Sequence, residues 1–140
     1  MIAVIDTNHL LRIAAARERS PLFVAWRDRR FDLAMSESML TELAGVMMRP
    51  KTQRFLPAEV GQRFLTDLQS RAVWVVPATE FPHCRDPKDD MVIATAVAAR
   101  VHFIVTTDRD LLDDPLLAAQ LYDESSIRVI LPAEFLSALG

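Results

Sequence analysis

The sequence has 140 residues, of which 51% are hydrophobic, and its formal net charge is −3. Its length predicts one domain over residues 1–140, and its composition argues against both a membrane span, which needs ~20 consecutive apolar residues, and a generally basic surface that coats nucleic acid. Because no signal-peptide pattern opens the chain and the single cysteine, Cys84, fits a reducing compartment, we expect a cytoplasmic protein.

Short apolar, β-branched segments alternate with segments of helical composition along the whole chain. Strands are predicted at residues 1–5, 31–35, 73–76, 103–107 and 127–131. Helices are predicted at residues 9–16, from Pro21 through Arg30 after the N-cap Ser20, from the cap Ser36 to Arg49, at residues 57–71, after the acidic turn at residues 86–90, and at residues 132–139. Residues 77–84 are expected to form a loop, and residues 111–126 a loop or short helix. The alternation predicts an α/β fold in three α/β/α layers around a central, mainly parallel twisted sheet.

Several acidic residues fall where the predicted strands end or where helices begin. Asp6 directly follows the first strand, and Asp108 and Asp110 follow the strand at residues 103–107. Glu42 and Asp90 belong to helices that begin at the same edge of a parallel sheet, where ligands usually bind. Taken singly, each acid has an ordinary explanation as a helix cap, a turn residue or a solvated side chain.

The combination of these acids predicts a metal site. Two unpaired carboxylates ~4 Å apart repel each other by about 4 kcal/mol at an effective dielectric constant near 20, so folding needs a cation to keep them together. Oxygen ligands of this kind suit Mg²⁺ or Mn²⁺, and the chain has no Cys/His spacing typical of zinc. Such an ion lowers the pKa of a bound water and neutralises charge on a phosphodiester, which indicates hydrolysis of nucleic acid.

Four motifs in order resemble those of the PIN domain, in particular the PIN-family toxin components of bacterial toxin–antitoxin pairs. They are VIDTN at residues 4–8, Ser36 followed by Glu42, RDPKDDMVIATA at residues 85–96 and VTTDRDLL at residues 105–112, with PAEFL at residues 132–136 also similar. The resemblance implies an endoribonuclease that depends on Mg²⁺ or Mn²⁺, is neutralised by an antitoxin and forms a homodimer. Thr107 stands where this branch of the family often has glycine.

The resemblance also implies roles for individual residues. Asp6, Glu42 and Asp90 match the first three acids of the family and would hold the principal metal. Asp108 matches the fourth acid, with Asp110 as an additional or substitute ligand. The supporting residues, which would orient these carboxylates or cap the helix that carries one of them, are Thr7, Asn8, Ser36 and Thr106.

Nearly all basic residues are arginines, and a group of them, Arg27, Arg29 and Arg30, stands near the end of the second predicted helix. Arginine suits bidentate contact with phosphate, so we expect RNA to track across this part of the protein. Solvated helix faces remain an equally good interpretation of these residues.

Two other functions stay open at this point. A haloacid-dehalogenase-like phosphatase also has an aspartate after its first strand and acids that hold Mg²⁺, but it uses a second aspartate where this chain has Asn8. The other alternative is a catalytically inactive PIN-like module that binds RNA or protein. Phosphate-loop and dinucleotide-binding folds are excluded, because none of the three glycines falls in a suitable turn.

Overall fold

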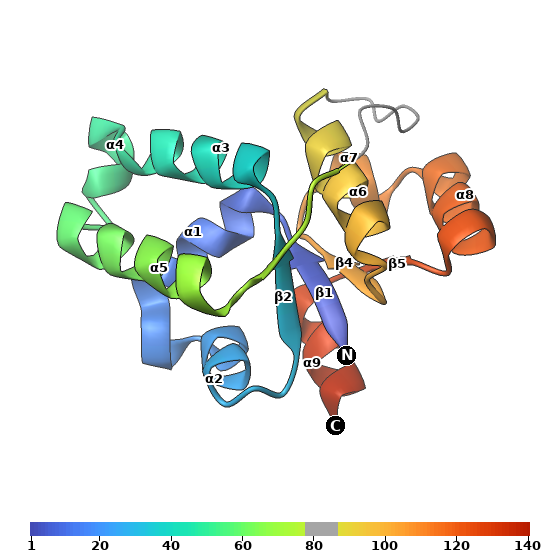
Figure 1. The fold of residues 1–140 in the computed structure, drawn as a ribbon, viewed down its shortest axis with the longest axis horizontal. Coiled ribbons are helices and arrows are strands. Elements are labelled where there is room, and N and C mark those ends of the chain that lie inside the picture. Colours follow the sequence, from blue (N-terminus) through green and yellow to red (C-terminus); the bar gives the residue numbers. More distant parts are fainter. Residues whose placement is uncertain (78–86) are drawn as a thin grey trace.

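The computed structural model describes residues 1–77 and 87–140, with the backbone alone for residues 87–90. Its centre is a sheet of five parallel strands in the order β3-β2-β1-β4-β5 (Figure 1). The strands are β1 (Ile2–Ile5), β2 (Asp32–Met35), β3 (Val73–Trp74), β4 (Phe103–Val105) and β5 (Arg128–Ile130). Together with the helices that cover the sheet, this confirms the predicted fold class.

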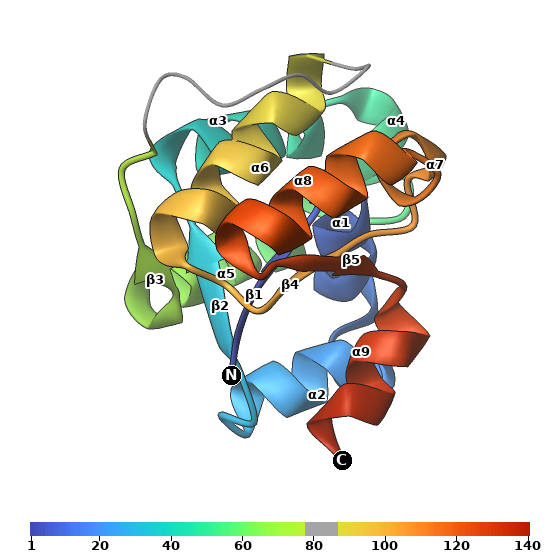
Figure 2. The same cartoon turned by 90° about the vertical axis from the view of Figure 1, so that its right-hand side faces the viewer.

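Helices cover both faces of the sheet. On one side lie α1 (Thr7–Ala16), α3 (Glu37–Met47) and α5 (Ala58–Arg71), and on the other lie α6 (Pro87–Ala99) and α8 (Pro115–Ser125) (Figures 1 and 2). The division follows from the strand order, because the chain moves outward from β1 to β3 and then returns past β1 to β4 and β5. Crossovers of one hand therefore lie on opposite faces before and after this reversal.

The remaining helices are short or lie at the ends of the strands. They are α2 (Pro21–Arg27), α4 (Pro50–Gln53), α7 (Arg109–Leu112) and α9 (Pro132–Leu139), with one 3-10 turn at Arg17–Arg19. The C-terminal helix α9 packs Phe135 edge-on against the rings of Phe31 and Phe103, with ring centroids 4.9 and 5.6 Å apart. These contacts close the core at the end of the sheet where the strands begin.

The structure corrects several predicted boundaries. The second helix ends at Arg27 rather than Arg30, because Asp28 leaves the helical conformation and Arg29 has a φ of 58°. The segment at residues 111–126 contains the second half of α7 and the whole of α8, whose N-cap Asp114 and first residue Pro115 are ordinary helix-start signals. Sequence analysis also missed α4, which begins at Pro50 after the predicted stop. The predicted loop at residues 77–84 lies, apart from Pro77, outside the described residues.

The strand pairing brings two polar residues together at the carboxyl end of the sheet. Ile5 pairs with Val105, and the backbone N–H of Asp6 donates to the carbonyl of Val105 at 3.1 Å. Asp6 and Thr106, one residue past these partners, therefore emerge side by side. This is the point where the strand order reverses, and open parallel sheets form their ligand crevices there. Within the described ranges, no helix is long and apolar enough to cross a membrane.

Candidate active site

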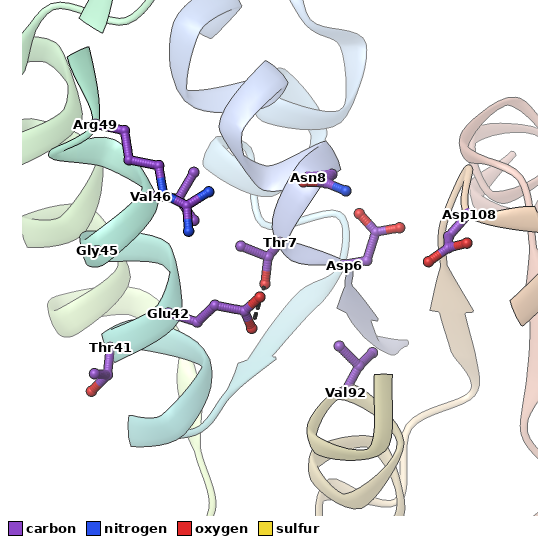
Figure 3. Close-up of a pocket in the computed structure, with 10 residues that line it drawn as sticks. All are labelled: Asp6, Thr7, Asn8, Thr41, Glu42, Gly45, Val46, Arg49, Val92 and Asp108. Carbon is purple, nitrogen blue, oxygen red and sulfur yellow. Dashed lines mark hydrogen bonds between the residues drawn. The ribbon is translucent and has the colours of Figure 1, made fainter. Parts of the chain in front are cut away.

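A cavity of about 500 Å³ opens at the carboxyl ends of β1 and β4, and we refer to it as the acid pocket (Figure 3). Its walls come from α1, α3, α6 and the loop after β4. The described residues that line it are Asp6, Thr7, Asn8, Thr41, Glu42, Gly45, Val46, Arg49, Val92 and Asp108. Three of the acids selected from the sequence, Asp6, Glu42 and Asp108, thus line one cavity.

The carboxylate of Asp6 is fixed on both oxygens. Asp6 caps α1, and its Oδ1 accepts a hydrogen bond of 2.8 Å from the backbone N–H of His9. Its Oδ2 accepts a hydrogen bond from the hydroxyl of Thr106. The side chain is 6% exposed. Each oxygen of an ionised carboxylate has about two acceptor sites, so both oxygens retain capacity for a further ligand.

Thr106 connects Asp6 to Asp108. Its hydroxyl has one hydrogen, which is donated to Asp6, and its oxygen accepts the backbone N–H of Asp108 at 2.9 Å. Asp108 in turn caps α7, and its Oδ1 accepts the backbone N–H of Asp110 at 2.9 Å. Thr106 is fully buried, so its rotamer is held by its surroundings. The two acids are therefore positioned by one hydroxyl group.

Glu42 enters the acid pocket from the other side. It lies in the second turn of α3, and Figure 3 shows Thr7 between Glu42 and Asp6. The hydroxyl of Thr7 donates to Oε2 of Glu42 at 3.5 Å, which is long for a hydrogen bond between oxygens. Glu42 is therefore held more loosely than Asp6, and its carboxylate has more freedom to adjust to a ligand.

A buried hydroxyl pair ties the start of α3 to α6. Ser36 caps α3 by accepting the backbone N–H of Met39 at 3.4 Å, and its oxygen lies 2.8 Å from that of Thr95 on α6. Because Thr95 donates its single hydrogen to the carbonyl of Met91 at 2.7 Å, Ser36 donates to Thr95. The helix that carries Glu42 and the helix that carries Asp90 are thus joined by one chain of hydrogen bonds. Sequence analysis selected Ser36 but not Thr95, which stands in the apolar part of its motif.

The placement of Asp90 is known only from its backbone. Residue 90 lies in the first turn of α6, and its side chain lies outside the described part of the chain. Val92, two residues further along α6, lines the acid pocket. The backbone of residue 90 is therefore less than a helical turn from a residue in the wall of the pocket.

The described acids of the pocket have no cationic partner. None of Asp6, Glu42 and Asp108 forms a salt bridge with a described residue. Arg49 is the one basic side chain among the described lining residues, and Figure 3 shows it at the opposite end of the pocket from Asp108. Burial lowers the pKa of His9, although the nearby Asp6 carboxylate raises it, so the imidazole adds no positive charge at pH 7.

The donor set of the acid pocket fits a small hard cation. Among the described side chains, no group of three or more Asp, Glu, His or Cys residues lies close enough together to hold an ion by itself. Mg²⁺ is commonly bound through one or two carboxylates and completes its shell with water and substrate phosphate. The described lining residues offer carboxylate, amide and hydroxyl oxygens and neither a thiol nor an imidazole, which meets that requirement, whereas zinc prefers nitrogen and sulfur ligands.

The other residues selected from the sequence lie outside the acid pocket or at its edge. Asp110 lines a neighbouring cavity, and Asn8 lines both cavities. Arg27, Arg29 and Arg30 lie at the opposite end of the strands, near the two chain termini (Figure 1). Thr107 does not adopt a positive φ, so the turn after β4 needs no glycine at that position.

The comparisons with known proteins give one match. A family model described as PIN domain matches residues 3–110, a range that runs from β1 into α7. No curated protein and no solved structure matches the chain. The matched range contains every acid selected from the sequence as a metal ligand, including Asp110 at its last position.

Proposed function

The chain belongs to the PIN domain family, and we propose from this premise that it is a metal-dependent endoribonuclease. PIN domains are typically nucleases, and those nucleases generally use divalent metals. The observation that carries the proposal is the convergence of Asp6, Glu42 and Asp108 on one pocket without a described cation to balance them. Carboxylates gathered in this way at the switch point of a parallel sheet are suited to a cation and a phosphate ester.

Asp6, Glu42, Asp90 and Asp108 are the proposed ligands of Mg²⁺ or Mn²⁺, with Asp110 beside them. When bound, such an ion lowers the pKa of a coordinated water and neutralises charge on the phosphate. The protein supplies the positions: Thr106 and the start of α1 hold the Asp6 carboxylate, and Thr7 contacts Glu42. In hydrolysis, a water oxygen bonds to phosphorus, the bond to one ester oxygen breaks, and that oxygen takes up a proton.

Arg49 supports phosphate binding in the same pocket. Its guanidinium lines the cavity that holds the acids and forms no ion pair or hydrogen bond with another described residue. A guanidinium binds two phosphate oxygens at once, which fixes the orientation of the ester as well as its position. The backbone of the substrate would therefore reach the acids past Arg49.

We extend the proposal to a toxin of a bacterial toxin–antitoxin pair that acts in the cytoplasm as a homodimer. Its support is the resemblance of the motifs at residues 4–8, 36–42, 85–96 and 105–112 to the PIN-family toxins, with the segment at residues 132–136 also similar. A small neighbouring reading frame that encodes a DNA-binding protein would supply the antitoxin. Induced expression is expected to stop bacterial growth, and co-expression of that neighbour to restore it. Growth arrest that persists in the Asp6→Asn variant would contradict the toxin proposal.

Cleavage of single-stranded RNA with Mn²⁺, with Mg²⁺ and with excess EDTA tests the enzymatic proposal. We expect cleavage with either ion and none with EDTA. Asp6→Asn and Glu42→Gln should each reduce cleavage at least ~100-fold, because loss of a partner that merely orients a metal ligand already costs about 10- to 100-fold. Glu37→Gln, an exposed glutamate in the first turn of the same helix α3, is the matched control.

Asparagine is a good N-cap, so Asp6→Asn keeps the cap of α1. Its single side-chain oxygen cannot serve both His9 and Thr106 fully, and relief of repulsion opposes this loss. The free energy of unfolding of Asp6→Asn should therefore differ from that of the wild type by no more than about 1 kcal/mol, the contribution of one hydrogen bond, and the melting temperature should shift only slightly.

Full cleavage by both Asp6→Asn and Asp90→Asn would refute the assignment. Hydrolysis of a phosphomonoester but not of RNA would favour a phosphatase, and absence of Mn²⁺ binding in calorimetry would favour an inactive binding module.

A further inference from the structure

A second cavity, of about 540 Å³, opens beside the acid pocket, and we refer to it as the side pocket. It shares Asp6, Asn8 and Asp108 with the acid pocket. Its other lining residues are Leu11, Arg12, Phe55, Thr107 and Asp110. Since the two cavities have three residues in common, a chain-like ligand whose phosphate lies among the acids can continue directly into the side pocket.

Phe55 gives the side pocket an apolar face. It follows α4 and is 55% exposed, whereas the next residue, Leu56, is 1% exposed and belongs to the core. Among the described aromatic residues, none stacks on the Phe55 ring. Single exposed apolar side chains are common on protein surfaces, but this one borders a cavity whose other walls carry carboxylates, hydroxyl and guanidinium groups. An aromatic ring in such a polar setting is suited to stack on an unpaired nucleobase.

Arg12 gives the side pocket a cation. It lies on α1 four residues after Asn8, so the two side chains are on the same face of the helix. Arg12 is exposed, and its guanidinium forms no ion pair or hydrogen bond with any other residue that the structure describes. A guanidinium without a protein partner, next to the acids of a nuclease, is available for a phosphate of the substrate.

We propose that the side pocket binds the nucleotide next to the scissile phosphate, with its unpaired base stacked on Phe55 and its phosphate held by Arg12. This inference rests on the proposed nuclease function and adds a path for the substrate. Figure 3 shows Arg49 at one end of the acid pocket and Asp108 at the other, and the side pocket, which shares Asp108, adjoins that second end. The RNA strand therefore runs from Arg49 across the acids to Arg12 in the side pocket. A base that stacks on Phe55 has left its own base pair, and the substrate is therefore single-stranded at the cut.

The first experiment measures binding of a fluorescently labelled single-stranded RNA by anisotropy, in EDTA so that the RNA stays intact. Phe55→Ala is expected to weaken binding roughly 5- to 150-fold, the range that stacking of one base on an aromatic side chain supplies. Phe55→Trp should retain the affinity, and its added emission should be quenched when RNA binds. Tyr122→Ala is the matched control, because Tyr122 is a similarly exposed aromatic residue, at 50%, on the distant helix α8.

The second experiment separates the phosphate contact from the stacking contact. Arg12→Gln should reduce the slope of log affinity against log salt concentration by about 0.7, the value for one phosphate contact to a single strand. Phe55→Ala should leave this slope unchanged, because a stacked base releases no counterion. Arg63→Gln serves as the charge control, since Arg63 is exposed on α5 and lines neither cavity.

Parallel cleavage assays with Mn²⁺ distinguish failure of the side pocket from failure of the nuclease proposal. If the wild type cuts RNA and both Phe55→Ala and Arg12→Gln bind and cut as well as the wild type, the side pocket is not a nucleotide site and the nuclease proposal stands. If the wild type cuts a single-stranded RNA and the corresponding RNA duplex at equal rates, the inference is also overturned. If the wild type binds RNA through Phe55 and Arg12 but never cuts it, the nuclease proposal fails, and the side pocket stands as a nucleotide site that is not tied to cleavage. A wild type that binds no RNA overturns both.

Discussion

At the carboxyl ends of the strands, Asp6, Glu42 and Asp108 line the acid pocket without a described salt bridge. Near the amino ends, by contrast, Arg27 and Arg30 are bonded to neighbouring groups. Arg27 pairs with Asp28 at 3.2 Å, and Arg30 donates to the carbonyl of Gly140 at 3.0 Å. These charged side chains are therefore bonded to protein groups at the amino end of the sheet, whereas the carboxylates at the carboxyl end have no described cationic partner.

The aromatic cluster of Phe31, Phe103 and Phe135 sharpens this contrast. It lies at the amino end beside α9, where the aromatic rings pack against one another and stabilise the fold. At the carboxyl end, the hydrogen bonds from His9 and Thr106 fix Asp6 in place but leave its negative charge uncompensated. These hydrogen bonds stabilise the fold, but they supply no positive charge, so the carboxylates at the carboxyl end are still suited to a bound cation.

The largest effect on cleavage is expected when the two acids after β4, Asp108 and Asp110, are replaced one at a time. Asp108 lines both cavities, whereas Asp110 lines the side pocket alone. Asp108→Asn should therefore reduce metal-dependent cleavage at least ~100-fold, while Asp110→Asn leaves the rate close to that of the wild type. Asp108→Asn keeps the melting temperature, since asparagine also caps α7. Asp110→Asn keeps it as well, because Asp110 bonds to Asp108 through its backbone N–H and not through its side chain. The reverse order of rates would make Asp110 the fourth ligand.

Thr106 should show the next largest effect. Thr106→Val keeps the shape of the side chain but removes the hydroxyl that contacts Asp6 and the backbone N–H of Asp108. We expect cleavage to fall about 10- to 100-fold, as for other groups that orient metal ligands, and the free energy of unfolding to fall by about 1–3 kcal/mol. Denaturant unfolding and metal titration measure the two effects separately.

Thr106→Ser is the control for that experiment, because it restores the hydroxyl without the methyl group. Recovery of both metal affinity and cleavage in Thr106→Ser is expected. A Thr106→Val variant that loses stability but binds metal as tightly as the wild type would show that Thr106 serves the fold alone, and the carboxyl end would then resemble the amino end.

The hydroxyl pair between α3 and α6 should have a smaller effect, mainly on stability. Ser36→Ala removes a helix cap as well as the bond to Thr95, which costs about 1 kcal/mol. In a double-mutant cycle with Thr95→Val, the two changes should be non-additive by about 0.5 kcal/mol or more. Additive losses would mean that α3 and α6 are held together by their apolar contacts alone.

The smallest effect is expected from the arginines at the amino end. Replacing Arg27, Arg29 and Arg30 by glutamine should leave the salt dependence of RNA binding unchanged and lower stability by at most about 1 kcal/mol, as for exposed ion pairs. Anisotropy titrations at several salt concentrations measure the slope. A slope reduced by about 0.7 for each arginine would show instead that RNA runs along this end of the sheet.

Local patterns were sufficient for most of the secondary structure. Five short apolar runs, four of them with β-branched residues, predicted the strands, and the caps Ser20 and Ser36 predicted two helix starts. These signals act within a few residues. Boundaries failed where a single backbone angle decided them, as at Arg29. The short helices α4 and α7 failed because four residues give too little periodicity to recognise.

The sequence by itself determined the parallel α/β architecture, the family and the acids that stand at strand and helix ends, since periodicity and motif order are written along the chain. Only the tertiary structure decided which side chains meet. The pairing of Ile5 with Val105 sets Thr106 beside Asp6, and the packing of α6 sets Thr95 against Ser36. The folding of α4 brings Phe55 to the same cavity as Arg12. These contacts join distant segments through strand register and helix packing, which no local pattern encodes.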